Sequence, residues 1–117
     1  MANLEHQRAE YAWEKSREGL TVGDSDYKNL CKGAPALIMS SGLMQTLAFY
    51  ADKNKPHHQA LNRHLMQWLN QRFPEKVLAA EFTAVMDSLY KSESPFYREA
   101  TTETLALLRW LRQFASV

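Results

Sequence analysis

The sequence predicts an all-α fold, a compact helical bundle of about five or six helices that forms a single domain over residues 1–117. Apolar residues recur three and four positions apart through most of the chain, which is the period of an amphipathic helix. No run of four or more residues alternates between apolar and polar side chains as a half-buried strand does. At 117 residues the chain is long enough to bury one continuous core but not two.

The first predicted helix covers residues 4–18, a segment rich in Ala, Glu, Gln, Lys and Arg, all of which favour helix. The helix is weakly amphipathic, and we expect the Gly19–Gly23 segment to end it, because glycine interrupts helices. The residues expected on its inner side are Leu4, Tyr11, Ala12 and Trp13.

A short second helix is predicted from Asp24 or Ser25, either of which can cap its start, to Lys32. Gly33 is expected to stop this helix, because glycine favours the position just after a helix end. Cys31 lies within it and is expected to be a small buried apolar residue. As the only cysteine, it excludes an internal disulfide and suits a reducing cytoplasm.

Pro35 suits the first turn of a third helix, and the apolar pattern continues from there to Ala51 or Asp52. Gly42 falls in the middle of this predicted helix, where glycine costs roughly 1 kcal/mol relative to alanine. We therefore expect Gly42 to serve helix packing, by allowing another helix to approach closely. The alternative is a simple break between two shorter helices.

The fourth predicted helix has the clearest amphipathic pattern of the chain, and it lies between the polar connection Asp52–Pro56 and Pro74, which ends it. Its apolar stripe consists of Leu61, Leu65, Trp68, Leu69 and Phe73. A fifth helix with the same period closes near Lys91. Its apolar residues are Leu78, Phe82, Val85, Met86 and Leu89.

The last predicted helix runs from about Pro95 to Ala115, with Ser94 as its cap. It is apolar on two faces, so we expect it either to be central in the fold or to contact a partner. One face carries Tyr97, Thr101, Leu105, Leu108 and Leu111, and the other carries Leu107, Trp110 and Phe114. Trp110 and Phe114 are therefore candidate interface residues.

Charge is sorted along the chain. Residues 27–72 hold six of the 14 basic residues and one of the 13 acidic residues, a balance of +5, while the remaining eight basic and twelve acidic residues give −4. Such polarity suggests a polyanion on one side of the domain, although a charge cluster is most often an ordinary solvated surface. The candidate RNA-contacting residues are Lys28, Lys32, Lys53, Lys55, Arg63 and Arg72. Because they span several helices and a loop, we expect only a subset to converge, with Lys53 and Lys55 foremost.

His57, His58 and His64 are the clustered candidates for metal binding or catalysis. Their spacing is not a zinc signature and lacks a third ligand, so we expect solvated histidines at a helix start and no metal. Metal-free ribonuclease chemistry could use two histidines as acid and base beside Lys53 or Lys55. Nothing in the sequence places these groups around a scissile bond, so we predict no catalytic residue and no cofactor.

The N-terminus lacks a basic segment leading into an apolar run, and no stretch approaches the ~18 apolar residues of a membrane span. We therefore expect a cytoplasmic protein without membrane contact. With 45% hydrophobic and 23% charged residues, the chain is neither disordered nor of low complexity.

Two blocks of the sequence resemble one known family. Residues 41–50 read Ser-Gly-Leu-Met-Gln-Thr-Leu-Ala-Phe-Tyr and are followed by Lys53. This block resembles the Gly-Leu block of the small helical subunit of the type III-B CRISPR effector, the Cmr complex. Residues 102–115, preceded by Tyr97, are similar to the closing helix of the same family. Neither block is a catalytic motif, so the resemblance identifies a family and not an active site.

The resemblance implies an all-helical subunit without a nuclease centre, which stacks beside the subunits that hold the crRNA. Its implied partners are the backbone and large subunits of the Cmr complex, other copies of itself, and crRNA and target RNA through the assembly. Residues 27–72, the basic segment, would then contact RNA phosphates without recognising the base sequence. The sequence thus predicts a non-catalytic structural subunit of an antiviral ribonucleoprotein. The alternatives are a stand-alone helical adaptor that binds only protein and, less favoured, a small metal-free ribonuclease.

Overall fold

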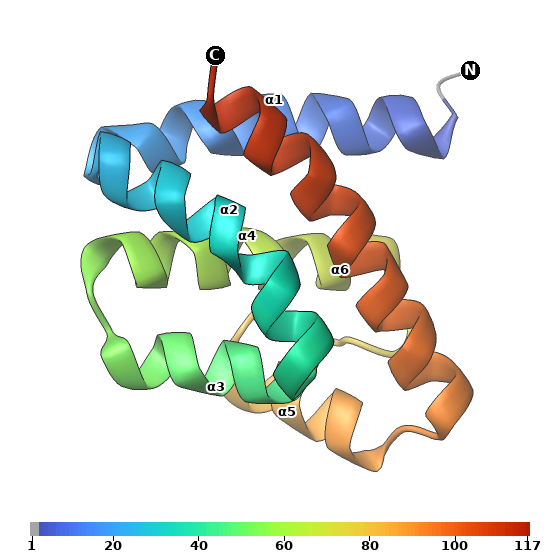
Figure 1. The fold of residues 1–117 in the computed structure, drawn as a ribbon. Helices are drawn as coiled ribbons and strands as arrows, with labels where there is room; N and C mark the ends of the chain where they lie inside the picture. Colours follow the sequence, from blue (N-terminus) through green and yellow to red (C-terminus); the bar gives the residue numbers. More distant parts are fainter. Residues whose placement is uncertain (1–2) are drawn as a thin grey trace.

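Six α-helices and no strand make up residues 3–117, the part of the chain that the computed structural model describes (Figure 1). The predicted all-α bundle is confirmed. The helices are α1 (Leu4–Val22), α2 (Asp24–Ser41), α3 (Leu43–Lys53), α4 (Pro56–Arg72), α5 (Phe82–Lys91) and α6 (Ser94–Ala115).

Helix α1 continues past residue 18, its predicted end, and Gly19 lies inside the helix. The Asn3 side chain accepts a hydrogen bond from the His6 backbone N–H at 2.8 Å and caps the start of the helix. At Gly19 the ring of Tyr27 packs directly on the backbone, and a Cβ there would lie 2.3 Å from Tyr27 Cζ. The helix ends at Val22 with Gly23 as its C-cap, so the predicted Gly19–Gly23 break lies at Gly23, while Gly19 allows close approach of a ring from α2.

Helix α2 is one continuous helix, so the predicted separation into two helices around Gly33 and Pro35 is wrong. Its buried stripe continues across both residues with helical spacing, which explains why packing overrides the local stop signals. Gly33 itself faces open space. The buried residues of the stripe are Tyr27, Cys31, Ala34 and Ile38.

The helical path is interrupted at Gly42, between α2 and α3. The prediction of one helix with Gly42 at its middle is therefore wrong, and the alternative, a break between two helices, is confirmed. Gly42 has φ 91° and ψ 160°, a conformation that side chains with a Cβ rarely adopt. Its N–H donates to the Ile38 carbonyl at 2.8 Å, and its own carbonyl accepts from Thr46 N–H at 3.1 Å. The Tyr97 hydroxyl accepts from Met44 N–H at 3.1 Å and thereby caps the start of α3.

Helix α6 begins close to its predicted start with its proline in the first turn, whereas α4 begins within the predicted polar connection and α5 is shorter than expected. Pro56 is the first residue of α4, and α6 starts at Ser94, one residue before its proline. Residues 73–81 form an irregular linker before α5. Leu78, expected on the apolar stripe of the fifth helix, lies in this linker and is 79% exposed.

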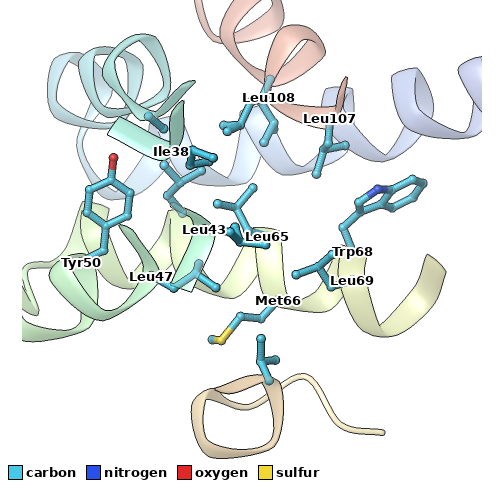
Figure 2. Close-up of a cluster of buried hydrophobic side chains, with 14 of the residues drawn as sticks. Ile38, Leu43, Leu47, Tyr50, Leu65, Met66, Trp68, Leu69, Leu107 and Leu108 are labelled. Carbon is cyan, nitrogen blue, oxygen red and sulfur yellow. The ribbon is translucent and has the colours of Figure 1, made fainter. Parts of the chain in front are cut away.

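The core is built around α4, which contacts α1, α2, α3 and α6 and buries nine of its 17 residues. Figure 2 shows Leu65, Trp68 and Leu69 of α4 among side chains of the other helices, which confirms the predicted stripe. Trp13 does not join this core. It is 45% exposed, because α1 turns Tyr11 and Ala12 inward instead.

We expect Gly42→Ala to lower the free energy of unfolding by about 1–3 kcal/mol, because a Cβ is strained at this positive φ. The matched control is Gly33→Ala, which places a Cβ in open space within a helix and should raise stability by about 0.5–1 kcal/mol. Urea denaturation of both variants measures the two effects. Equal shifts in the same direction would show that the backbone conformation at Gly42 is not constrained.

Candidate functional site

The two lysines of α2 lie on the flank of that helix that faces away from the start of α4. Successive residues are about 100° apart around a helix, so Lys28 lies to one side of the buried Tyr27 and Asp26 to the other. Asp26 Oδ2 is 3.9 Å from His57 Nδ1, so the Asp26 side faces α4. Lys32 lies one turn after Lys28, on the same far flank.

The two arginines of the basic segment are engaged by acidic side chains. Arg63 Nη2 lies 3.3 Å from Glu18 Oε1. Arg72 Nε lies 3.3 Å from Glu103 Oε1, and its guanidinium stacks 4.9 Å from the centre of the Phe73 ring. Both guanidinium groups therefore lie beside a carboxylate within the subunit.

Lys53, Lys55 and His57 lie where α3 ends and α4 begins, and we call these three residues the α3–α4 corner. Lys53 is the last residue of α3, and its Nζ lies 5.4 Å from the centre of the Phe49 ring. Lys55 is the N-cap of α4 and provides no side-chain cap. The positive end of the α4 dipole therefore adds to the charge of two exposed lysines. Asn54 makes the corner tight by adopting the left-handed conformation, with φ 55°.

The histidines do not form one solvated cluster, so that expectation is wrong. His64 has no exposed surface, because its ring lies between α1 and α2. His64 Nδ1 lies 2.8 Å from the Tyr27 hydroxyl, and its Nε2 lies 3.2 Å from Glu18 Oε1. His58 is also buried, with its ring 4.3 Å from that of His57.

The contacts of His64 join it to Tyr27 and Glu18 in a structural triad. Burial lowers the pKa of His64 to about 4, so the ring is uncharged at neutral pH. In a neutral ring that satisfies both partners, Nε2–H donates to Glu18, and Nδ1 accepts from the Tyr27 hydroxyl. This hydrogen bond from His64 holds the pKa of the Glu18 carboxyl below its usual value. The triad joins α1, α2 and α4, and two of its members, Tyr27 and His64, have no exposed surface.

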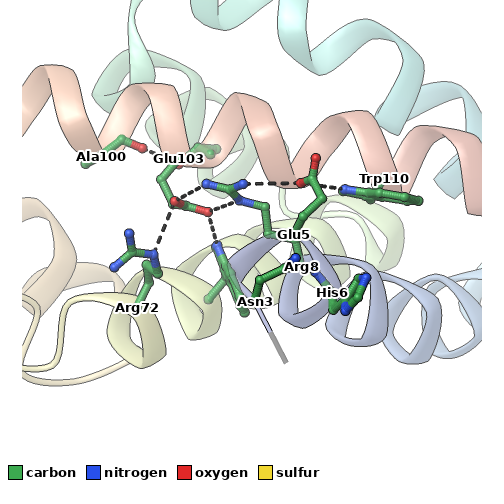
Figure 3. A network of polar contacts seen from close by, with 10 residues as sticks. Asn3, Glu5, His6, Arg8, Arg72, Ala100, Glu103 and Trp110 are labelled. Atoms are coloured by element: carbon green, nitrogen blue, oxygen red, sulfur yellow. Dashed lines mark hydrogen bonds and ion pairs between the residues drawn. The ribbon is translucent and has the colours of Figure 1, made fainter. Parts of the chain in front are cut away.

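A second buried network surrounds Glu103, which is 4% exposed (Figure 3). Arg8 binds this carboxylate in a bidentate way, with Nε at 2.7 Å and Nη2 at 2.8 Å. The Trp68 indole N–H donates to it at 3.0 Å, and Arg72 lies beside it. Burial alone would raise the pKa of Glu103, but the hydrogen bonds from Arg8 and Trp68 outweigh it and the pKa is lowered. An ionised carboxylate thus ties α6 to α1 and α4.

Trp13, Phe114 and Trp110 form a partly exposed row of rings across α1 and α6, which we call the aromatic ledge. The Phe114 ring centre lies 5.3 Å from that of Trp13 and 5.4 Å from that of Trp110. Arg17 stacks 4.3 Å from the Trp13 ring, and the Trp110 indole N–H donates to Glu5 at 3.1 Å. The sequence pattern indicated Trp110 and Phe114 but missed Trp13, which it placed inside.

The described residues offer little for other kinds of chemistry. Between residues 3 and 117, no group of three or more His, Cys, Asp or Glu side chains could hold a metal ion. Cys31 is buried as predicted, and burial raises the pKa of its thiol to about 12, which leaves it unreactive. None of the six helices combines the length and the apolar character that crossing a membrane requires.

The sequence model of the CRISPR-associated Cmr5 family matches residues 4–117. The chain belongs to the Cmr5 family. It is also similar to the crystal structure of a CRISPR-associated Cmr5 family protein from Thermus thermophilus, with a TM-score of 0.83 and 27% sequence identity over 99% of this chain and 96% of that one. Membership of the Cmr5 family makes this chain a small subunit of the type III-B CRISPR effector, associated with other Cmr subunits. The resemblance seen in the sequence is confirmed.

The two blocks that carried the resemblance occupy structural positions in this Cmr5-family protein. Residues 41–50 span the Gly42 break and most of α3, where Tyr97 caps the helix. Residues 102–115 are the part of α6 that carries Glu103 and the α6 side of the aromatic ledge.

We expect the free energy of unfolding to fall by roughly 3 kcal/mol as pH drops from 6.5 to about 4, because of His64. Between these pH values the unfolded chain binds a proton at His64 that the folded chain excludes. The stability that the neutral His64 contributes is therefore complete above pH 6.5 and is lost as the pH falls to about 4. The variant His64→Gln keeps a polar side chain without titrating. Its stability, measured by urea denaturation across this pH range, should fall less steeply. The same slope in both proteins would contradict the assignment.

Proposed function

We propose that this Cmr5-family subunit is a non-catalytic structural component that stacks beside the crRNA-holding backbone and contacts target-RNA phosphates through the α3–α4 corner. The observation that supports the phosphate contact is which basic side chains are exposed and lack an acidic partner. Lys53 and Lys55 are exposed and form no ion pair within residues 3–117, whereas Arg63 and Arg72 each face a carboxylate. Two lysines free of acidic partners can release counterions from a phosphate backbone without reading bases.

A non-catalytic role is supported by where the potential acids and bases lie. The carboxylate of Glu103 and the imidazole of His64 are both buried, and each is hydrogen-bonded to side chains of other helices. His57 and His58 adjoin each other. Burial lowers the pKa of His58, and the nearby positive charges of His57, Lys53 and Lys55 lower it further. Because the His58 side chain is buried, the two rings do not form an accessible acid and base pair. We place the subunit in the cytoplasm, which the free thiol of Cys31 suits.

The aromatic ledge supports a lateral contact with a neighbouring subunit. Partly exposed tryptophans with one polar edge are typical of interface anchors. Trp13 and Trp110 fit this description, because Arg17 and Glu5 respectively hold them in fixed orientations. A protein-only adaptor would use this ledge and leave the α3–α4 corner without a partner, so the two surfaces separate the two functions.

We expect the purified subunit to leave a labelled single-stranded RNA intact, with or without a chelator. The physical reason is that no accessible pair of groups in the described chain is arranged as acid and base around a scissile phosphate. Gel analysis of the RNA over several hours is sufficient. Cleavage that disappears in the variant His57→Ala plus His58→Ala would instead establish a ribonuclease.

We expect Lys53→Glu plus Lys55→Glu to weaken target-RNA binding by the assembled complex and to lower its salt slope by about 0.7 for each lost phosphate contact. The matched control is Lys28→Glu plus Lys32→Glu, which makes the same change of charge on the far flank of α2. This control should leave the slope closer to that of the wild type.

The measurement is RNA affinity across a salt series, with assembly checked for each variant. If the α3–α4 corner variant binds with unchanged affinity and slope, the lysines are solvated surface and the subunit is a purely structural spacer. If only the α2 pair changes the slope, the RNA-facing surface lies on that flank instead.

We expect Trp13→Ser to reduce incorporation of the subunit into the complex, because loss of an interface anchor costs about 2 kcal/mol, or about thirtyfold in affinity. Trp13 is 45% exposed, so the folded subunit should survive the change, and circular dichroism checks this. Tyr90→Ser removes a ring that is 73% exposed on α5 and serves as the control. Equal incorporation of both variants would exclude the ledge as an interface.

A further inference from the structure

The segment around α5 is sparsely buried. Two of the 16 residues from 78 to 93 are buried, Val85 and Leu89, whereas α4 buries nine of its 17 residues. Among the helices of the described chain, α3 is the only one with which α5 has more than a marginal contact. Phe82 and Met86 also pack partly buried against the core, so the apolar contacts that hold α5 in place come from four side chains.

A surface pocket lies between the end of α5 and the first turn of α6. It is open to solvent and has a volume of about 430 Å³, with walls formed by side chains of α5 and by the first turn of α6. Beside it, the Ser88 hydroxyl donates to the Lys76 carbonyl at 2.6 Å, in an exposed position where the bond competes with water. The α5 residues that line the cavity are Asp87, Ser88 and Lys91.

Firm attachments lie on both sides of this segment. Before it, Val77 is fully buried, and its carbonyl accepts from Asn70 Nδ2 at 2.7 Å. After it, Phe96 is 5% exposed and packs edge-on against Phe73, with ring centres 5.2 Å apart. A loosely held helix between two fixed points can detach without moving the rest of the chain.

We propose that residues 78–93 form a separate opening unit, which detaches and unfolds while α1, α2, α3, α4 and α6 stay folded. Helix α5 has ten residues, which is too short to remain helical alone in water, so its detachment also breaks its backbone hydrogen bonds. The opening exposes Val85 and Leu89 beside the already exposed Leu78 and Tyr90, and it gives the subunit a surface that can change shape.

Native-state hydrogen exchange of the full chain tests this inference. The amides of residues 86–91 should be at least about tenfold less protected than those in the middle of α4. The discriminating variant is Leu111→Ala, at the opposite end of α6 from α5 (Figure 1). It destabilises the native state and the α5-open state alike, so it should speed exchange in α4 at least about tenfold and leave exchange in α5 unchanged.

Val85→Ala is the matched variant within the unit. It destabilises the native state relative to both the open and the unfolded states, so it should speed exchange in α5 and in α4 together. The inference is overturned if Leu111→Ala speeds the α5 amides as much as those of α4, because a single cooperative unit behaves in that way.

Urea dependence of the wild-type protein gives the same answer should Leu111→Ala fail to fold. Exchange of the α5 amides through local opening exposes little surface and should be nearly independent of urea below the unfolding transition. Exchange of the α4 amides should rise steeply with urea. Identical urea dependence in the two helices would show that α5 opens only with the whole domain.

Discussion

The Glu103 carboxylate fixes how the first and last helices of the domain meet the central one. A buried charge is tolerated only when its lone pairs are satisfied, and Arg8 of α1 and Trp68 of α4 donate hydrogen bonds to them, while the Arg72 guanidinium lies within ion-pair distance. Removing a partner from such a network costs about 3–5 kcal/mol, because an unpaired charge remains. The bidentate geometry of Arg8 sets the register of α1 on α6, and through it the position of the aromatic ledge.

The sequence predicted the fold class and α4, the helix at the centre of the domain, but the structural roles of Gly19, Gly33 and Gly42 were not predicted correctly. The apolar stripe of α4 is long and regular, so burial agrees with the local pattern. Gly19 and Gly33 both read as helix stops, yet Tyr27 packs on the first and nothing contacts the second. Gly42 read as part of a helix and is a break. A local pattern shows that a glycine is present, whereas tertiary packing decides what it does.

The candidate site was only partly predictable for a related reason. The excess of positive charge in residues 27–72 was visible in the sequence, but whether each charge is free depends on partners far along the chain. Arg72 lies 31 positions before Glu103, and no spacing rule joins them. His64 looked like a member of a histidine cluster and is buried, since its position on α4 faces Tyr27. Lys53 and Lys55 were the easier case, because a short polar connection between helices keeps them at the surface.

The Tyr97 hydroxyl that caps α3 also has a consequence for how the chain folds. Its acceptor role means that the start of α3 is completed by a residue of α6, which is synthesised after α3. The most extensive helix contact in the domain, between α1 and α6, likewise joins the two ends of the described chain. Contacts of such long sequence separation raise the contact order of an otherwise local helical fold and slow its folding. Native packing therefore waits for the C-terminal helix to emerge, and a nascent chain without it exposes the surfaces that α6 later covers.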